Sequence, residues 1–295
     1  YHSEDRFKFS LNLQGSQSSN ILRLDKLMEY RDGKLRFARW EYEPQKRLLV
    51  SPQIYLTGNS PWLKSGKIII AAQVLEESRI MRKFGSLDRE TQRENLKVFS
   101  LNADFKGKIN DKIDFSYGLE STHNDVRSTA YSQTLYTKGR EALGLLNRTP
   151  IATRYPSGGG TYSTFAAYID YRYDINLKST LSLGARQTIT ELNASWSEQA
   201  LIDVRLDRVN QNNKASNFTL GYTQLVNSKT QLKALISTGF RSPNIDDLGK
   251  TREHGGVLTV ANMHLNPEYI RSSEIGLKYR WQKKSFLDLN AYYAI

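Results

Sequence analysis

Apolar and polar residues alternate with a period of two along most of this chain, and this alternation constrains the fold more than any other feature. In the first such segment Phe7, Phe9, Leu11 and Leu13 alternate with polar residues. The pattern is typical of a β-strand with one apolar and one polar face. It predicts about eleven strands, over residues 7–13, 45–57, 65–78, 99–105, 113–120, 165–173, 181–185, 218–222, 232–236, 275–281 and 287–295.

The length and the polar face of these strands indicate a membrane environment. We expect strands of ~9 to 14 residues, whereas strands of ordinary globular domains have about 5 to 6 and a tilted bilayer-crossing strand needs ~9 to 11. The polar face carries charges that a dry core would not accept, including Asp104, Glu120, Asp170 and Arg186. The sequence therefore predicts an all-β fold, an antiparallel up-and-down transmembrane β-barrel with an apolar exterior and a polar lumen.

The predicted connections alternate between long and short. Short ones are expected at 106–110, 174–177, 226–228 and 282–284, and the longest others span ~25 to 40 residues, with one of ~14 between the strands at 65–78 and 99–105. If the strands run up and down, all short turns lie at one rim, as in outer-membrane barrels. A large water-soluble antiparallel β-protein is the alternative, but such folds seldom keep their long loops at one end.

Composition excludes several other classes. The net charge is +12, from 42 Lys and Arg against 30 Asp and Glu, but the positive charges stand in ones and twos, so we expect no nucleic-acid partner. No apolar run approaches the ~18 to 20 residues of a membrane helix. The absence of cysteine removes disulfides and thiol nucleophiles. Nucleophile-elbow, phosphate-loop and His-Glu-x-x-His motifs are missing, so we predict that the chain is not an enzyme.

Two short motifs near the carboxyl end form a pair. Residues 240–249 read Phe-Arg-Ser-Pro-Asn-Ile-Asp-Asp-Leu-Gly, and residues 266–269 read Asn-Pro-Glu-Tyr before a Ser-Glu-Ile-Gly-Leu-Lys-Tyr strand. This order resembles the paired boxes of TonB-dependent outer-membrane receptors, in which a Phe-Arg-Ala-Pro-like box ends a strand and an Asn-Pro box follows a long loop. Ser242 replaces the Ala of that box, and the second box is contracted. Similar stretches at 40–49, 76–79, 82–85 and 153–158 extend the resemblance over nearly the whole chain.

The resemblance implies a receptor in the outer membrane of a Gram-negative bacterium, with a barrel of about twenty-two strands, an amino-terminal plug and a TonB box, driven by the TonB-ExbB-ExbD complex. Residues 1–295 are then expected to be a partial barrel domain of about eleven strands, with plug, TonB box and the last strands not present. No permanently bound cofactor is expected. The implied activity is uptake of an iron-bearing ligand, either haem (free or in a haemoprotein) or a ferric siderophore.

Both boxes have a structural reading besides ligand contact. Pro243 interrupts ladder hydrogen bonding, so the first box, Phe240, Arg241, Pro243 and Asn244, is interpreted as a strand end that turns into a loop. The second box, Asn266, Pro267 and Glu268, is interpreted as the re-entry into the next strand. Direct ligand contact by Arg241 and Glu268 is the weaker alternative.

Two of the four histidines, His254 and His264, lie between the boxes. The resemblance to haem receptors implies an axial histidine in this loop, so His254 is the first candidate ligand of haem iron and His264 the second. A histidine that is merely solvated is the alternative. For a ferric siderophore, basic and aromatic residues matter instead, among them Arg79, Arg82 and Trp40. The same residues are equally suited to bind the phosphates of lipopolysaccharide, in which case their partner is the outer-membrane lipid.

Two further function classes stay open at this stage. A passive porin-like outer-membrane barrel would lack the plug, and a soluble β-rich adhesin would fold without lipid or detergent.

Overall fold

The computed structural model describes residues 6–295 except 140, 198–207, 250–251, 255–256, 260–261, 263 and 283–284, and it describes only the backbone of 142, 249, 252–254 and 257–259. His2 lies outside the described residues. In the described part, eleven strands pair with their neighbours in chain order, each antiparallel to the next. They are β1 (Phe7–Gln17), β6 (Lys46–Thr57), β7 (Ser65–Lys83), β8 (Asp88–Asn110), β9 (Ile113–Lys138), β11 (Gly160–Asn176), β12 (Ser179–Ala194), β13 (Val209–Leu225), β14 (Thr230–Arg241), β17 (Glu268–Gln282) and β18 (Ser285–Ala294). The predicted all-β, up-and-down architecture is confirmed.

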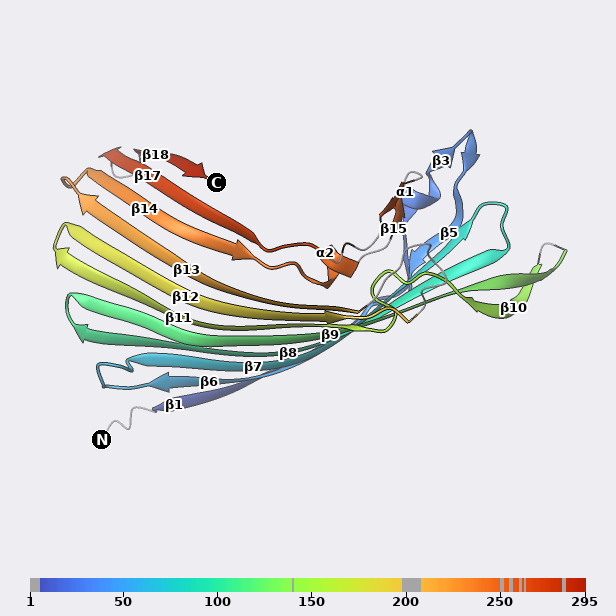
Figure 1. The fold of residues 1–295 in the computed structure, drawn as a ribbon, viewed down its shortest axis with the longest axis horizontal. Helices are drawn as coiled ribbons and strands as arrows, with labels where there is room; N and C mark the ends of the chain where they lie inside the picture. Colours follow the sequence, from blue (N-terminus) through green and yellow to red (C-terminus); the bar gives the residue numbers. More distant parts are fainter. Residues whose placement is uncertain are drawn as a thin grey trace.

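The smaller elements all lie in the connections at one end of the sheet (Figure 1). Between β1 and β6 the chain forms β2 (Ile21–Leu22), α1 (Leu24–Leu27), β3 (Tyr30–Arg31), β4 (Lys34–Leu35) and β5 (Phe37–Tyr42). β10 (Glu141–Pro150) pairs with the end of β9, and α2 (Ile245–Gly249), β15 (Arg252–His254) and β16 (Val257–Thr259) lie between β14 and β17. We call this the outer end and the other the short-turn end. Neither of the two short helices in the described part of the chain could span a bilayer.

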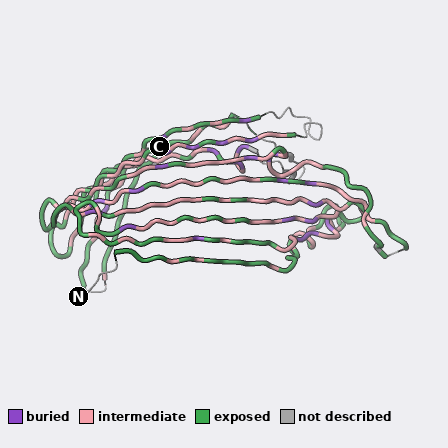
Figure 2. Tube along the Cα trace, turned by 90° about the horizontal axis from the view of Figure 1, so that it is seen from below, coloured by how far each residue is buried: buried purple, intermediate pink, exposed green. Residues whose placement is uncertain are grey.

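The sheet is strongly curved (Figures 1 and 2), and α2 lies on its concave side (Figure 1). Residues directly opposite each other in neighbouring strands share a face, so the register separates the two sides. The predicted polar face is the concave one: Asp104 lies opposite Gly118, which lies opposite Tyr168, and the Tyr168 hydroxyl donates to Asp104. In the same way Arg186 pairs with Glu120. Asp104 and Arg186 therefore have polar or charged partners within the wall.

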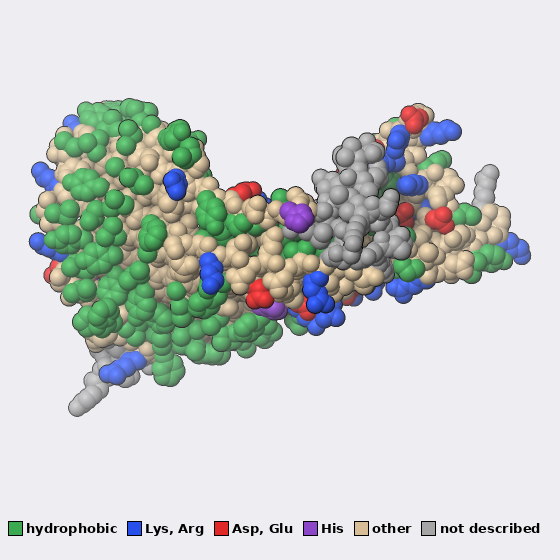
Figure 3. All heavy atoms as spheres, in the orientation of Figure 1, with side chains coloured by type: hydrophobic (Ala, Val, Ile, Leu, Met, Phe, Trp, Pro, Cys, Tyr) green, Lys and Arg blue, Asp and Glu red, His purple; other side chains and the backbone are tan. Residues whose placement is uncertain are grey.

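The convex face carries an apolar band toward the short-turn end. It contains large hydrophobic side chains at least one-third exposed, including Phe9, Leu13, Val50, Ile70, Val74, Phe99, Leu119, Phe165, Ile169, Leu183, Phe218, Leu220, Leu232, Ile236, Ile275 and Leu289. Figure 3 shows hydrophobic side chains gathered over the left of the view, whereas Lys, Arg, Asp and Glu are more frequent toward the outer end at the right. An apolar convex band around a polar concave wall is the division of faces that a lipid-embedded barrel requires.

Two of the expected long connections are wrong in length. The ~14-residue link before the strand at 99–105 is a tight hairpin at residues 84–87, and much of the ~40-residue link after residue 120 continues β9 to Lys138. β7, β8 and β9 extend beyond the apolar band, where both faces meet water or other loops. Hydrogen bonding continues there without an apolar face, so the period-two signal disappears although the strand does not.

The short-turn end is tied together by aromatic rings. The ring of Phe115 lies 5.5 Å from that of Trp62 and 5.9 Å from that of Tyr117, which stacks on Phe105 at 5.3 Å. Gly107 makes this packing possible, because an added Cβ would lie 2.2 Å from Cζ of Phe115. The turn that follows comprises residues 111–112, slightly later than predicted. Aromatic side chains at such a rim are typical of the interfacial girdle of membrane barrels.

Candidate functional site

The concave face carries a hollow at its outer end, about 920 Å³ in volume. Its wall comes from β1, β6, β7, β8, β9 and β11, and α2 and residues 154–155 also line it. The lining combines basic, acidic and aromatic side chains with an apolar floor; it includes Arg47, Leu75, Glu77, Arg79, Glu94, Leu96, Val126, Arg154, Tyr155, Tyr162, Ile245 and Asp246. We refer to it as the α2 hollow.

The short helix α2 is fixed by its own sequence. The Asn244 side chain accepts hydrogen bonds from the backbone N–H groups of Asp246 (2.8 Å) and Asp247 (3.1 Å), and the Asp247 carboxylate accepts one from the backbone N–H of Asn244 (3.1 Å). This reciprocal pattern is that of a capping box. Pro243, which lacks an N–H, directly precedes the cap, so the ladder of β14 ends and the helix begins within three residues.

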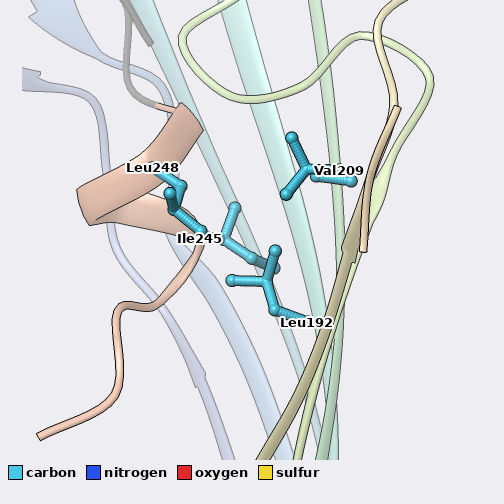
Figure 4. Close-up of a cluster of buried hydrophobic side chains, with 5 residues drawn as sticks. Leu192, Val209, Ile245 and Leu248 are labelled. Carbon is cyan, nitrogen blue, oxygen red and sulfur yellow. The ribbon is translucent and has the colours of Figure 1, made fainter. Parts of the chain in front are cut away.

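Apolar packing holds α2 against the concave wall (Figure 4). Ile245 and Leu248 of the helix form a buried cluster with Leu192 and Ala194 of β12 and Val209 of β13. Leu248 is fully buried and Leu192 is 2% exposed. Burying an aliphatic side chain of this size contributes roughly 1.5 to 3 kcal/mol. The cluster therefore fixes one side of the α2 hollow.

The residues of the two predicted boxes meet around the start of this loop. Arg241 lies directly opposite Glu268 in the β14–β17 register, and Phe240 lies opposite Tyr269 with ring centroids 5.4 Å apart. Arg241 donates to Glu268 (3.2 Å) and to both carboxylate oxygens of Asp247 (2.8 and 2.9 Å). Asn266 and Pro267 lie in the coil that leads into β17. The ion pair between Arg241 and Glu268 thus joins the two boxes.

Ser242, which stands where the resembling box has Ala, has hydroxyl partners on the wall. Its Oγ accepts a hydrogen bond from Asn213 Nδ2 (3.0 Å) and lies 2.8 Å from Oγ1 of Thr190. These contacts tie the first box to β12 and β13 in addition to β17. Sequence reasoning did not identify this role, because Thr190 and Asn213 are distant in sequence and only strand pairing brings them near.

Tyr155 connects α2 to the opposite side of the hollow. Its hydroxyl donates to Oδ1 of Asp246 at 2.8 Å. Burial, followed by the hydrogen bond to this carboxylate, raises the pKa of the Tyr155 hydroxyl above its ordinary value. The phenol therefore stays protonated at neutral pH and remains a hydrogen-bond donor.

Arg79 lies on the concave face beside two carboxylates. It pairs with Glu77 on its own strand, and Glu77 lies directly opposite Glu94 on β8. Both carboxylate oxygens of Glu94 are buried without a hydrogen-bond partner among the described groups. Burial raises the pKa of Glu94 to about 7, although the charge of Arg79 opposes this shift. The residue lies beyond the apolar band, in the outer extension of β8. The charge of the hollow therefore changes near neutral pH.

The three residues predicted to contact a siderophore are divided between the two faces of the sheet. Trp40 is 8% exposed and packs edge-on against Tyr42, whose ring lies 5.6 Å from the Arg79 guanidinium. Arg82 is on the convex face, where its Nη1 donates to the backbone carbonyl of Ser86 at 2.8 Å. Trp40 and Arg79 thus share one face of the outer end, whereas Arg82 faces away from it.

The candidate haem ligands are placed only in part. The His254 backbone belongs to β15, but its side chain lies outside the described residues. His264 is exposed in a turn, where its backbone N–H donates to Asn262 Oδ1 at 3.0 Å. Among the described side chains, no three His, Asp or Glu residues converge as a metal site would require. Ligation by either histidine stays a prediction.

Glu94, Arg154 and Tyr155 were not predicted as site residues. Glu94 lies in a stretch without period-two alternation, and residues 154–155 lie in a connection whose path depends on β9 and β11. The sequence signal that could have indicated Glu94 is the charged run on the β7 and β8 extensions, once their pairing is known.

A known family model describes this chain almost from end to end. The model for the TonB dependent receptor-like β-barrel matches residues 2–294. The chain belongs to this family. Barrels of TonB-dependent receptors lie in outer membranes and act as transporters, which agrees with the convex apolar band and the polar concave wall. A soluble adhesin and a passive porin are not favoured by this match.

Solved receptor structures share the fold. The chain is similar to the copper transporter OprC (11% identity, TM-score 0.67, 86% of this chain and 39% of that one). It is also similar to the ferric yersiniabactin uptake receptor FyuA from Yersinia pestis (14%, 0.58, 98% and 42%). A third is the hemophore receptor HasR of Serratia marcescens, solved with its hemophore HasA and heme (13%, 0.50, 97% and 49%). The chain thus spans less than half the length of each. No curated protein sequence matches it.

Proposed function

We propose that this chain forms part of the barrel wall of an outer-membrane receptor that takes up an iron-bearing ligand, either haem or a ferric siderophore. The α2 hollow carries the proposal, because it opens on the concave face at the outer end and combines arginine, tyrosine and carboxylate groups. Guanidinium groups and ring faces suit the carboxylates of haem and the anionic oxygens of siderophores. Of the structurally similar receptors, FyuA takes up ferric yersiniabactin, and HasR was solved with its hemophore HasA and heme.

The whole receptor would need parts beyond this wall. We propose that a plug and a TonB box are supplied by sequence outside residues 1–295, and that TonB, ExbB and ExbD provide the energy through them. Outer-membrane lipid and lipopolysaccharide would contact the convex face, where the apolar band lies. Within the wall, Glu120, Arg186 and Asp104 then line the lumen that the plug would occupy.

For haem, the histidines of the 242–267 segment are the proposed ligands, His254 first and His264 second. Neutral imidazole is a good ligand of haem iron. The ion pairs of Arg241 anchor this segment next to the α2 hollow, so a haem held there could contact both the loop and the wall. For a ferric siderophore, Arg79 is the proposed anion contact inside the hollow and Trp40 a neighbouring packing residue.

Haemin titration of the complete receptor, purified from outer membranes in detergent, tests the choice. The Soret band is followed for the unaltered protein and for His254→Ala, His264→Ala and His123→Ala. His123 is the matched control, since it faces outward and bonds to Ser163 (2.8 Å). Haem uptake predicts a saturable shift that His254→Ala weakens at least tenfold and His123→Ala leaves unchanged.

A different result redirects the assignment. Equal weakening by all three variants would contradict axial ligation from this loop. Without a saturable shift, haem is excluded, and ferric siderophores are then titrated by quenching of tryptophan fluorescence. Arg79→Gln should weaken that binding, with Arg172→Gln near the short-turn end as the control. If neither ligand class binds, the proposed function is wrong.

A further inference from the structure

Three arginines lie side by side across three neighbouring strands of the outer end. In the register, Arg39 of β5 is directly opposite Arg82 of β7, which is directly opposite Arg89 of β8. Directly opposed residues share a face, with Cβ atoms about 4.5 to 5.5 Å apart. We refer to these three residues as the arginine row.

The arginine row is on the convex face. Along β7, Ile70 and Val74 are exposed on that face, and Arg82 follows them at an even spacing, which in a strand preserves the side. Arg79, at an odd spacing, lines the α2 hollow on the concave side. The row therefore lies on the same side as the apolar band, farther toward the outer end, and outside the proposed ligand path.

The positive charge of the arginine row is only partly balanced. Arg39 pairs with Glu41, whose side chain is 8% exposed. Arg82 donates to the carbonyl of Ser86 (2.8 Å), and Arg89 donates to Oε1 of Gln133 (3.3 Å). In the described part of the chain neither Arg82 nor Arg89 has a carboxylate within ion-pair distance.

The surroundings of Arg89 disfavour its positive charge. Its Nε is buried and has no hydrogen-bond partner among the described groups. Burial, followed by the charge of Arg39, lowers the pKa of Arg89 below its ordinary value, although the more distant charges of Glu43 and Glu41 oppose this shift. Like charges directly opposite on a sheet are destabilising. By contrast, Arg93, two positions further along the same face, has the carboxylate of Glu43 at 3.3 Å.

A multiply charged oxyanion would supply the negative charge that the arginine row lacks. A phosphate group offers several oxygens to neighbouring guanidinium forks and removes the repulsion between them. We propose that Arg39, Arg82 and Arg89 form a binding site for a phosphate-bearing anion on the convex face of the outer end. The anion is either a phosphate group of a glycolipid in the surrounding membrane or free phosphate.

The two sources differ in what they require. Only the glycolipid source rests on the proposed outer-membrane location, because it needs the convex face to meet the membrane surface. Binding of free phosphate depends on the arginine row alone. A failed haemin or siderophore titration therefore leaves this proposal intact, and a failed phosphate titration leaves the proposed function intact.

The test uses the complete receptor in phosphate-free detergent and two probes. Inorganic phosphate is titrated by calorimetry, and lipid nanodiscs with bisphosphorylated or dephosphorylated lipid A are compared by native mass spectrometry for lipid retained on the protein. The row variant is Arg82→Gln with Arg89→Gln. The matched control is Lys97→Gln with Arg127→Gln, which removes two positive charges from the same face.

The row variant should weaken the binding of inorganic phosphate, of bisphosphorylated lipid A, or of both at least tenfold. The control variant should change the binding of either probe less than twofold. If the row variant loses binding only of bisphosphorylated lipid A, the ligand of the row is the glycolipid phosphate. If it also loses binding of inorganic phosphate, the row binds phosphate groups in general. A second variant, Arg82→Lys with Arg89→Lys, keeps both positive charges but removes the forked guanidinium donors. It should bind the phosphate probes with intermediate affinity, and it tests the row if the Gln variant does not fold. Equal weakening by row and control variants, or saturable binding of neither probe, would overturn the proposal.

Discussion

Arg241 Nη2 donates to both carboxylate oxygens of Asp247, at 2.8 and 2.9 Å, while its Nη1 reaches Glu268 at 3.2 Å. One guanidinium thus links the end of β14, the first turn of α2 and the start of β17. The two carboxylates raise the pKa of Arg241 above its ordinary value, so it is charged at every accessible pH. The first role of the box arginine in this structure is to close the base of the loop at residues 242–267.

Replacing this arginine should therefore loosen the loop. We expect Arg241→Ala in the complete receptor to increase the rate of limited proteolysis within residues 242–267 several-fold, because both ion pairs are lost. Arg271→Ala is the matched control, since Arg271 is exposed on β17 and lies outside this pairing. Equal cleavage of both variants would show that the ion pairs do not hold the loop.

Removing Leu248 should detach α2 from the wall. This side chain is fully buried against Leu192 and Val209, and truncating a buried leucine costs about 2 to 5 kcal/mol. In Leu248→Ala we expect faster hydrogen exchange at residues 244–248, while strands near the short-turn end keep their protection. Leu24→Ala, at a position 63% exposed, is the control. Unchanged exchange in α2 would mean that the capping contacts alone hold the helix.

Stability should fall between pH 4.5 and 7 because of Glu94. Burial raises its pKa from 4.5 to about 7, so between these values the folded protein binds more protons than the unfolded chain. The contribution of this group is fully present below pH 4.5 and is lost as the pH rises through 7. The change is on the order of 1 to 3 kcal/mol in the free energy of unfolding.

The Glu94→Gln variant isolates this effect. Because glutamine does not ionise, the fall in stability from pH 4.5 to 7 should become smaller, as measured by urea unfolding of the detergent-solubilised receptor. Glu141→Gln, at an exposed position, should leave the pH profile unchanged. Identical profiles for the Glu94 variant and the unaltered protein would contradict the buried state of this carboxyl.

A methyl group at Gly107 should disturb the short-turn end. An added Cβ would lie 2.2 Å from Cζ of Phe115, whose ring is 6% exposed and packed in the aromatic cluster. We expect Gly107→Ala to lower the free energy of unfolding by roughly 1 to 3 kcal/mol, as overpacking does. Gly15→Ala has no atom within 4 Å of its new methyl and should be nearly neutral. Phe115→Leu should partly rescue the Gly107 variant.

Alternation along the sequence was sufficient to predict the sheet where lipid contact imposes it. Residues such as Phe99, Leu119 and Phe165 must be apolar because one face meets lipid, and their neighbours polar because the other meets the lumen. Strand existence, the face of each residue and the up-and-down order follow from that local rule. The motif around Arg241 and its position at the end of a strand were also predicted from the sequence.

The tertiary structure decided everything that depends on register. Beyond the apolar band neither face needs to be apolar, so the outer extensions of β7, β8 and β9 carry no periodic signal. Only the pairing of these extensions places Glu77 opposite Glu94, and Arg82 between Arg39 and Arg89. Contacts such as Tyr155 with Asp246 join residues far apart in the chain. The sequence by itself therefore determined the lipid-facing wall. The α2 hollow and the arginine row depend on which residues of neighbouring strands lie opposite each other, and no local sequence pattern encodes that pairing.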